Sequence, residues 1–300
     1  MPVDRLNATF AIPGVAEFTA GPGGLPQLHV SNQAANARIS IYGGQVLSYT
    51  PRTADADLLY LSTKAHYAPG KAIKGGVPIC WPWFGAHPTD SSRPAHGFAR
   101  NMPWVVYAVT DRSPSCTRVA LRLTDTADTQ SLWPHRFILE LELDIGVELA
   151  MTLTTHNAGN APFTITQALH TYFATASIDA TRVTGLDGHR YLDKTQGFSE
   201  QLQDGDVRFD SEVDRIYQGV SSPLQIHDDA RGRVVHIQAQ NSRTAVVWNP
   251  WREIGAAMSD LDDEAYRRFV CVETANAADD VIEVGAGDSF SLCARYRITP

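Results

Sequence analysis

Residues 137–143 read Phe-Ile-Leu-Glu-Leu-Glu-Leu, and this alternation of apolar and charged side chains predicts a β-strand with one buried face. The pattern recurs along the chain, with turn residues such as Asn157-Ala-Gly-Asn160 between the segments. The spacing of these short segments predicts an all-β fold, built as a large antiparallel sandwich or barrel. The other expected strands are 37–42, 45–49, 117–123, 147–155, 163–174, 233–238, 244–248 and 290–298.

Helical patterns are rare in this chain, and one segment carries a persuasive signal. Ser259 or Asp260 is placed to cap a helix over Leu261–Tyr266, with acidic residues in its first turn. No low-complexity linker, internal repeat or composition break divides the sequence. We therefore expect a single domain over residues 1–300 with few short helices.

Bulk composition excludes several classes of function. The 300 residues are 43% hydrophobic and 19% charged, which is a soluble globular profile, and the net charge of −8 argues against nucleic-acid binding. No basic leader and no run of about 18 apolar residues occurs, so we expect a cytoplasmic protein without a membrane partner. Cysteines 80, 116, 271 and 293 lack CxxC spacing, so we expect free, partly buried thiols.

The segment Lys74–Arg100 reads KGGVPICWPWFGAHPTDSSRPAHGFAR and combines glycines, prolines, aromatic rings and cations. Strands and helices avoid so much Gly and Pro, so this stretch predicts a shaped loop. Shaped loops often carry function, and aromatic faces beside cations suit an anionic, partly apolar ligand such as a phosphorylated sugar. The alternative interpretation is a rigid buried connection between strands.

Two titratable residues are candidates for acid/base chemistry. His170 lies in QALHTYF, where alternation inside a strand would place Ala168, His170 and Tyr172 on one face. Glu273 follows the apolar run 269–272 and is expected at the end of a buried strand, where burial would raise its pKa. Each also has a plainer interpretation. His170 would then be a satisfied core or edge histidine, and Glu273 would be a solvated acid at the end of a strand.

Two further residues fit a sugar site. Asp193, in YLDK, would accept hydrogen bonds from sugar hydroxyls or form a surface ion pair with Lys194. Trp248, in WNPW, offers a stacking surface, although core packing is the commoner role of tryptophan. The chain lacks GxGxxG, GxxxxGK[ST], GxSxG and HExxH, and its histidines show no metal-site spacing, so we predict no cofactor and no metal.

Several segments of the chain together are similar to one known family. The segments KGGVPICWPWFG and PAHGFAR resemble the hexose-6-phosphate mutarotases, also called glucose-6-phosphate 1-epimerases, within the aldose 1-epimerase (galactose mutarotase-like) superfamily. The resemblance implies a β-supersandwich and an isomerase that interconverts the α and β anomers of a hexose 6-phosphate. It spans residues 43–276 and includes GGQVLSY at 43–49, ALHTYF at 168–173, YLDK at 191–194, VVWNPW at 246–251 and VETAN at 272–276.

The resemblance also implies a role for each site residue. Glu273 would take the proton of the C1 hydroxyl while a protonated His170 donates to the ring oxygen, and the roles reverse on ring closure. The remaining implied roles are phosphate binding by Lys74 and Arg100, hydroxyl contacts by His96, Asp193 and Gln45, and an apolar wall at Trp248.

One position departs from the family pattern, because Lys74 stands where Arg is usual. Lys keeps the charge but lacks the bidentate fork, so phosphate affinity is in doubt unless another cation such as Arg93 contributes. Two alternatives therefore stay open: an aldose 1-epimerase acting on unphosphorylated sugars, and a non-catalytic sugar-binding module. A closed sandwich has few exposed edges, so we expect a monomer.

Overall fold

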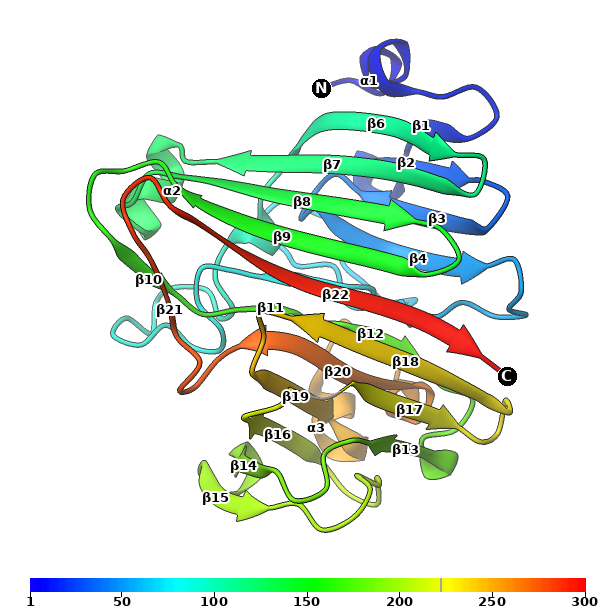
Figure 1. Ribbon diagram of the computed structural model, residues 1–300, viewed down its shortest axis with the longest axis vertical. Helices are drawn as coiled ribbons and strands as arrows, with labels where there is room; N and C mark the ends of the chain where they lie inside the picture. The colour runs from blue at the N-terminus through cyan, green and yellow to red at the C-terminus, as the bar shows by residue number, and fades with distance from the viewer. Residues whose placement is uncertain (222) are drawn as a thin grey trace.

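A long antiparallel sheet of eight strands forms one layer of the molecule and faces the viewer in Figure 1. The computed structural model, which describes residues 1–221 and 223–300, orders this sheet β13-β17-β18-β22-β9-β8-β7-β6. Its strands are β13 (Thr181–Thr184), β17 (Leu224–Asp228), β18 (Arg233–Gln240), β22 (Ser289–Thr299), β9 (Leu149–Asn157), β8 (Phe137–Ile145), β7 (Cys116–Thr124) and β6 (Val105–Ser113).

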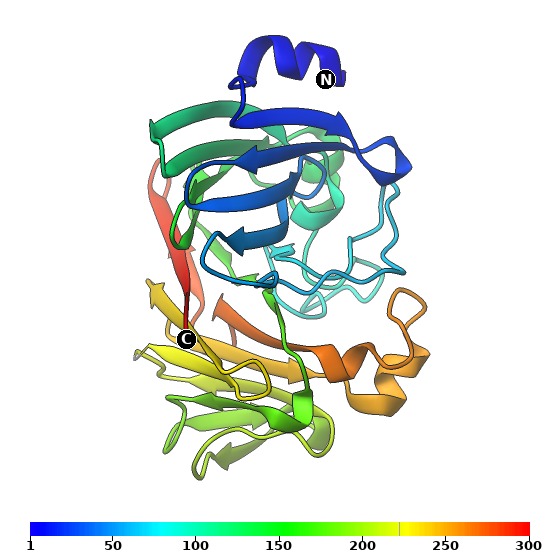
Figure 2. The same cartoon turned by 90° about the vertical axis from the view of Figure 1, so that its right-hand side faces the viewer.

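Two sheets make up the opposite layer, behind the long sheet in Figure 1 and beside it in Figure 2. The first is β1 (Ala16–Ala20), β2 (Pro26–Ser31), β3 (Ala35–Ser40) and β4 (Gln45–Pro51). The second has the order β15-β14-β16-β19-β20-β11-β5, with β12 also paired to β20. Its strands are β15 (Ser199–Leu202), β14 (Arg190–Asp193), β16 (Val213–Gln218), β19 (Thr244–Asn249), β20 (Phe269–Asn276), β11 (Gln167–Leu169), β12 (Tyr172–Ala174) and β5 (Ile79–Cys80).

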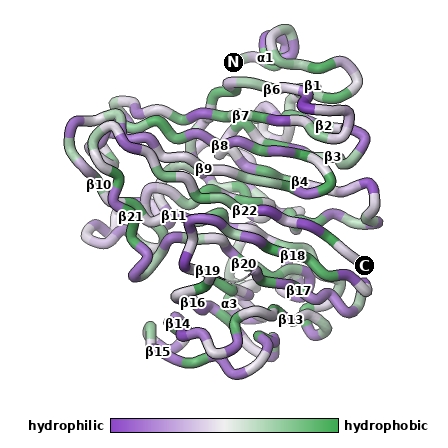
Figure 3. Tube along the Cα trace, viewed as in Figure 1, coloured by the Kyte–Doolittle hydropathy of each residue, from purple (hydrophilic) through white to green (hydrophobic). Residues whose placement is uncertain are grey.

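Alternating side chains build the core between these layers. Phe137, Leu139, Leu141 and Leu143 of β8 are all completely buried, as the alternation at 137–143 predicts. Figure 3 shows the same alternation of hydrophobic and hydrophilic residues along the strands of the long sheet. Small β10 (Phe163–Ile165) and β21 (Ile282–Val284) pair at one end of the molecule. The predicted all-β antiparallel sandwich is confirmed.

The helices are short, and the α-helix predicted from sequence over Leu261–Tyr266 is not formed there. The α-helices among the described residues are α1 (Val3–Phe10), α2 (Ala127–Leu132) and α3 (Trp251–Ala257), whereas 259–264 forms turns before a 3-10 turn at Ala265–Arg268. The acids expected to start a helix bind neighbouring segments instead: Asp262 accepts from Thr63, and Asp263 pairs with Lys64. None of these helices has the length and apolar character needed to cross a membrane.

The segment 163–174 is also less regular than predicted. It divides into β10, β11 and β12, and His170 and Thr171 lie in the break between β11 and β12 rather than inside a strand. The His170 amide donates to the Pro78 carbonyl at 3.0 Å, which diverts the backbone from the β20 ladder. The predicted faces are nevertheless retained, since Leu169 and Phe173 join the main core and Ala168 and Tyr172 lie in separate clusters.

Candidate active site

His170 and Glu273 meet where β11 and β12 leave β20 partly unpaired. The distance from His170 Nε2 to Glu273 Oε1 is 3.3 Å, and the two side chains are only 9% and 2% exposed. Glu273 lies within β20, which is buried along its whole length, so the expectation of a strand-end acid is wrong. His170 Nδ1 and Glu273 Oε2 are buried without a protein partner, which leaves both atoms for a ligand.

Burial changes the acid–base properties of this pair. It lowers the pKa of His170, and nearby His96, Arg100 and Lys74 lower that pKa further. It raises the pKa of Glu273, with Asp214 adding to the effect and Lys194 and Arg100 opposing it. The ligand-free pair therefore favours uncharged forms, unlike the imidazolium and carboxylate expected from sequence. When His170 and Glu273 share a single proton, one of the two residues can donate it and the other can accept one.

Aromatic rings enclose the His170 imidazole. The Tyr172 ring stacks on it with centroids 4.9 Å apart and an interplanar angle of 11°. Trp248, from β19, lies edge-on to both rings with centroid distances of 6.0 Å. The expected wall at Trp248 is thus next to the acid/base pair. The sequence places Tyr172 on the same face as His170 but indicates no role for it, because a tyrosine in a strand gives no signal of stacking.

His96 approaches His170 from the Lys74–Arg100 loop, with ring centroids 5.7 Å apart. Burial lowers the pKa of His96 to about 3, and the charges of Arg100, Lys194 and Lys74 contribute. The neutral ring accepts a 3.3 Å hydrogen bond at Nδ1 from the Gly85 amide, which leaves Nε2 to carry the proton. His96 is therefore suited to donate to a neutral hydroxyl.

Lys74 is positioned by the backbone around it. Gln45 Nε2 donates to the carbonyls of Ile73 at 3.0 Å and Gly75 at 2.6 Å, on either side of Lys74. Gln45 is completely buried and its Nε2 positions the backbone around Lys74, while its Oε1 has no protein partner and stays available for the expected hydroxyl contact. Gly76 has φ of 62°, and a Cβ there would lie 2.2 Å from the Val46 carbonyl oxygen. Only glycine fits that position.

The expected phosphate cations have different partners. Lys74 Nζ lies 3.5 Å from Asp260 Oδ2. Arg100 Nη2 donates to the Ala95 carbonyl at 3.0 Å, and its Nε is buried without a partner. Arg93, considered as an additional cation, pairs with Asp90 of its own loop at 3.0 Å.

Asp193 ends β14 and is only 3% exposed. Its Oδ1 accepts from the amide and hydroxyl of Thr195 at 3.0 and 2.6 Å, and its Oδ2 accepts from Gln196 at 2.9 Å. The alternative ion pair with Lys194 is wrong, because Lys194 Nζ binds Asp214 Oδ2 of β16 at 2.6 Å. The local hydrogen bonds fix the Asp193 carboxylate in one orientation at the end of its strand.

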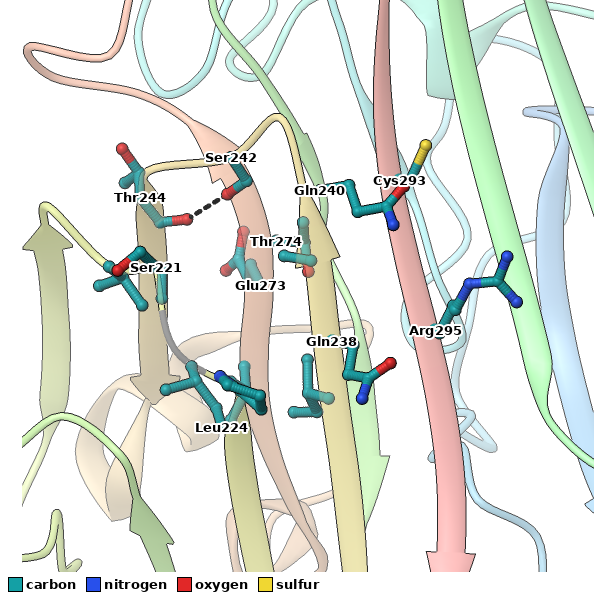
Figure 4. A pocket seen from close by; sticks show the side chains of 16 residues that line it. Ser221, Leu224, Gln238, Gln240, Ser242, Thr244, Glu273, Thr274, Cys293 and Arg295 are labelled. Atoms are coloured by element: carbon teal, nitrogen blue, oxygen red, sulfur yellow. Dashed lines mark hydrogen bonds between the residues drawn. The ribbon is translucent and has the colours of Figure 1, made fainter.

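A separate cavity of about 190 Å³ lies between β19 and β20 on one side and β18 and β22 on the other (Figure 4). Val272, Glu273 and Thr274 all line this cavity, but strand alternation directs the Glu273 carboxylate to the opposite face of β20, where His170 lies. The cavity is therefore not the acid/base site. Within residues 1–221 and 223–300, no three His, Cys, Asp or Glu side chains group to hold a metal, and all four cysteines are free.

Comparison with known proteins identifies the family of this chain. The sequence profile described as Aldose 1-epimerase matches residues 26–297. The chain belongs to the aldose 1-epimerase family. Proteins named "Putative glucose-6-phosphate 1-epimerase" are similar to it: one from Escherichia coli (strain K12) is 35% identical, covering 83% of each chain. Another from Cenchrus ciliaris is 35% identical, covering 92% of this chain and 85% of that one.

Solved structures of similar proteins share the fold. A crystal structure from Salmonella typhimurium, described as "a putative mutarotase", superposes with a TM-score of 0.89 at 29% identity and covers 99% of both chains. A galactose mutarotase related enzyme from Lactobacillus acidophilus has a TM-score of 0.71 at 14% identity, covering 91% of this chain and 97% of that one. The second likeness is one of fold alone. The family supports a carbohydrate epimerase activity.

Proposed function

We propose that this protein interconverts the α and β anomers of hexose 6-phosphates, with glucose 6-phosphate as the first candidate. The observation that carries the proposal is the buried contact of His170 and Glu273, each with one polar atom that no protein group satisfies. Anomerisation requires one group that accepts the C1 hydroxyl proton and one that donates to the ring oxygen. A pair holding a single proton supplies both functions.

In the proposed mechanism, Glu273 accepts the C1 hydroxyl proton and His170 donates to the ring oxygen. The ring opens to the aldehyde, the C1–C2 bond rotates, and closure returns both protons with the roles reversed. His96 Nε2 and the Asp193 carboxylate orient hydroxyls, and Trp248 covers an apolar face of the sugar. Each positioned proton transfer contributes roughly 10²- to 10⁴-fold to the rate.

Phosphate binding would help place the shared proton. Arg100 lowers the pKa of both His170 and Glu273, whereas Lys74 acts on His170 and Lys194 on Glu273. A phosphate dianion on Lys74 would offset its charge and raise the pKa of His170. The proton would then move toward the imidazole, which is the acid that the ring oxygen needs.

The alternative of an aldose 1-epimerase on unphosphorylated sugars rests on one specific observation. Lys74 replaces the usual arginine, and Asp260 lies 3.5 Å from its Nζ. A cation with one carboxylate partner offers less free positive charge to a phosphate than an unpaired one. This alternative predicts that removing the phosphate from the substrate barely changes kcat/KM.

Anomer exchange measured by NMR on glucose 6-phosphate and on glucose tests the proposal. The variants are Glu273→Gln and His170→Ala, with Glu200→Gln, at a 57% exposed side chain, as the matched control. We expect fast exchange of the phosphate sugar, reduced by on the order of 10²-fold or more in both site variants and unchanged in the control. Equal rates on glucose would support the alternative, and sugar binding without faster exchange would leave a binding module.

A further inference from the structure

Lys74 already has an acidic partner, and this distinguishes it from Arg100. Its Nζ lies 3.5 Å from Asp260 Oδ2, with the two side chains 18% and 24% exposed, and 3.9 Å from Met258 Sδ. In the described part of the chain, no carboxylate oxygen lies within 4.0 Å of the Arg100 guanidinium. One expected phosphate cation is therefore neutralised by the protein, and the other is not.

Asp260 is held against Lys74 by the loop that carries it. Ser62 Oγ donates to the Asp260 main-chain carbonyl at 2.6 Å, and Thr63 Oγ1 donates to Asp262 at 2.7 Å. Leu261 is 1% exposed and packs in the cluster that contains Tyr172, the ring stacked on His170. These contacts anchor the Asp260 main chain and the two residues that follow it, so Asp260 is a fixed neighbour of the site.

We propose that Asp260 is a specificity-determining residue that weakens binding of a dianionic phosphate relative to a neutral sugar. This inference rests on the proposed function. The Asp260 carboxylate and a substrate phosphate are both anions that need the same Lys74 ammonium. Because the pair is partly buried, salt screens their repulsion less than it would at an open surface. An ammonium is a point charge without the planar fork that engages two oxygens at once.

The chemistry of the reaction explains how weaker phosphate binding, caused by Asp260 beside Lys74, would serve the enzyme. Substrate and product are two anomers that carry the same phosphate. Contacts to that phosphate are equally strong before and after the chemical step, so they lower KM without accelerating the reaction. A carboxylate beside Lys74 limits that uniform binding and favours release, while it also provides a counter-ion for the lysine before substrate arrives.

The test compares Asp260→Asn with Asp263→Asn. Asp263 belongs to the same loop, is 82% exposed and pairs with Lys64, so it reproduces the change in net charge away from the site. The Ser62 bond to residue 260 uses a main-chain carbonyl, so the loop tether survives the substitution. We expect Asp260→Asn to lower KM for glucose 6-phosphate by about 3- to 10-fold, without raising kcat and with less than a twofold change of KM for glucose.

Asp263→Asn should leave both values unchanged. A higher KM for the phosphate sugar in Asp260→Asn would overturn the proposal and make Asp260 a residue that orients Lys74. Titration with inorganic phosphate separates this inference from the proposed function. If wild type shows no preference for the phosphate sugar, the proposed function fails, yet tighter phosphate binding by Asp260→Asn would still support the role of Asp260. Equal phosphate affinities would overturn it.

Discussion

At the scale of the residue, His96 shows how burial fixes a protonation state. Its pKa is lowered to about 3 in the folded protein, against 6.5 as the ordinary value. Between these values the unfolded chain binds a proton that the native ring refuses. The stabilising contribution is therefore complete above pH 6.5 and is lost as the pH falls toward 3, at up to about 1.4 kcal/mol per pH unit.

This predicts a pH-dependent effect of His96→Asn. Relative to the variant, wild type should lose about 1–2 kcal/mol of unfolding free energy between pH 7.5 and pH 5, because only wild type has the ring that must stay neutral. Urea unfolding at the two pH values measures the difference. His66→Asn, at an exposed histidine, is the control and should show no such change. A parallel pH dependence of wild type and His96→Asn would contradict the assignment.

At the scale of the element, the Lys74–Arg100 loop depends on close backbone contacts. Gly97 has φ of 71°, and a Cβ there would lie 1.9 Å from the Trp81 carbonyl oxygen. The same segment contains β5 and the 3-10 turn Ala99–Asn101, and its aromatic residues Trp81, Trp83 and Phe98 are buried. The loop is thus a packed connection between strands, and it also carries the proposed site residues His96, Lys74 and Arg100.

Gly97→Ala in this loop and Gly14→Ala, in the turn before β1, separate the two costs of adding a side chain. Gly14 has a similar φ of 74° but no atom within 4 Å of an added Cβ, so alanine there should cost only the backbone penalty of roughly 1–2 kcal/mol. Gly97→Ala adds a collision with backbone and should be clearly more destabilising. Thermal and urea unfolding of both variants measure this, and equal losses would show that the loop relaxes freely.

At the scale of the whole molecule, single hydroxyl bonds tie the layers together. Tyr296 of β22 is completely buried, and its hydroxyl lies 2.7 Å from Thr171 Oγ1, next to His170. Tyr49 of β4 is also completely buried and donates to the Gly146 carbonyl at 2.8 Å, and its strand belongs to a different sheet from His170 and Glu273. The long sheet therefore supports the acid/base pair from behind.

Tyr296→Phe and Tyr49→Phe are matched variants that test whether the long sheet supports the acid/base pair. Each removes one buried hydrogen bond and should cost roughly 1 kcal/mol of unfolding free energy. We expect only Tyr296→Phe to lower kcat/KM in the anomer-exchange assay, by a few fold, because Thr171 fixes the backbone beside His170. Equal kcat/KM in the two variants would show that the long sheet does not position His170.

The sequence by itself determined the sandwich, since alternation at segments such as 137–143 requires one buried face in each strand. It also singled out His170, Glu273 and the Lys74–Arg100 loop, because histidine, a carboxylate after apolar residues and a Gly/Pro-rich run are unusual in strands. The missed helices α1 and α2 and the misplaced one at 261–266 reflect weak local signals, which contacts such as Thr63 to Asp262 override.

Only the tertiary structure decided how those residues work together. The break between β11 and β12 that brings His170 to 3.3 Å from Glu273 depends on a carbonyl at Pro78, which is far away in the chain. The same holds for the partners of Lys194 and Lys74, which are Asp214 and Asp260. Such pairs join separate segments, and the pKa shifts of His170 and Glu273 come mainly from burial. Neither can be read from local patterns, because both are properties of the packed molecule.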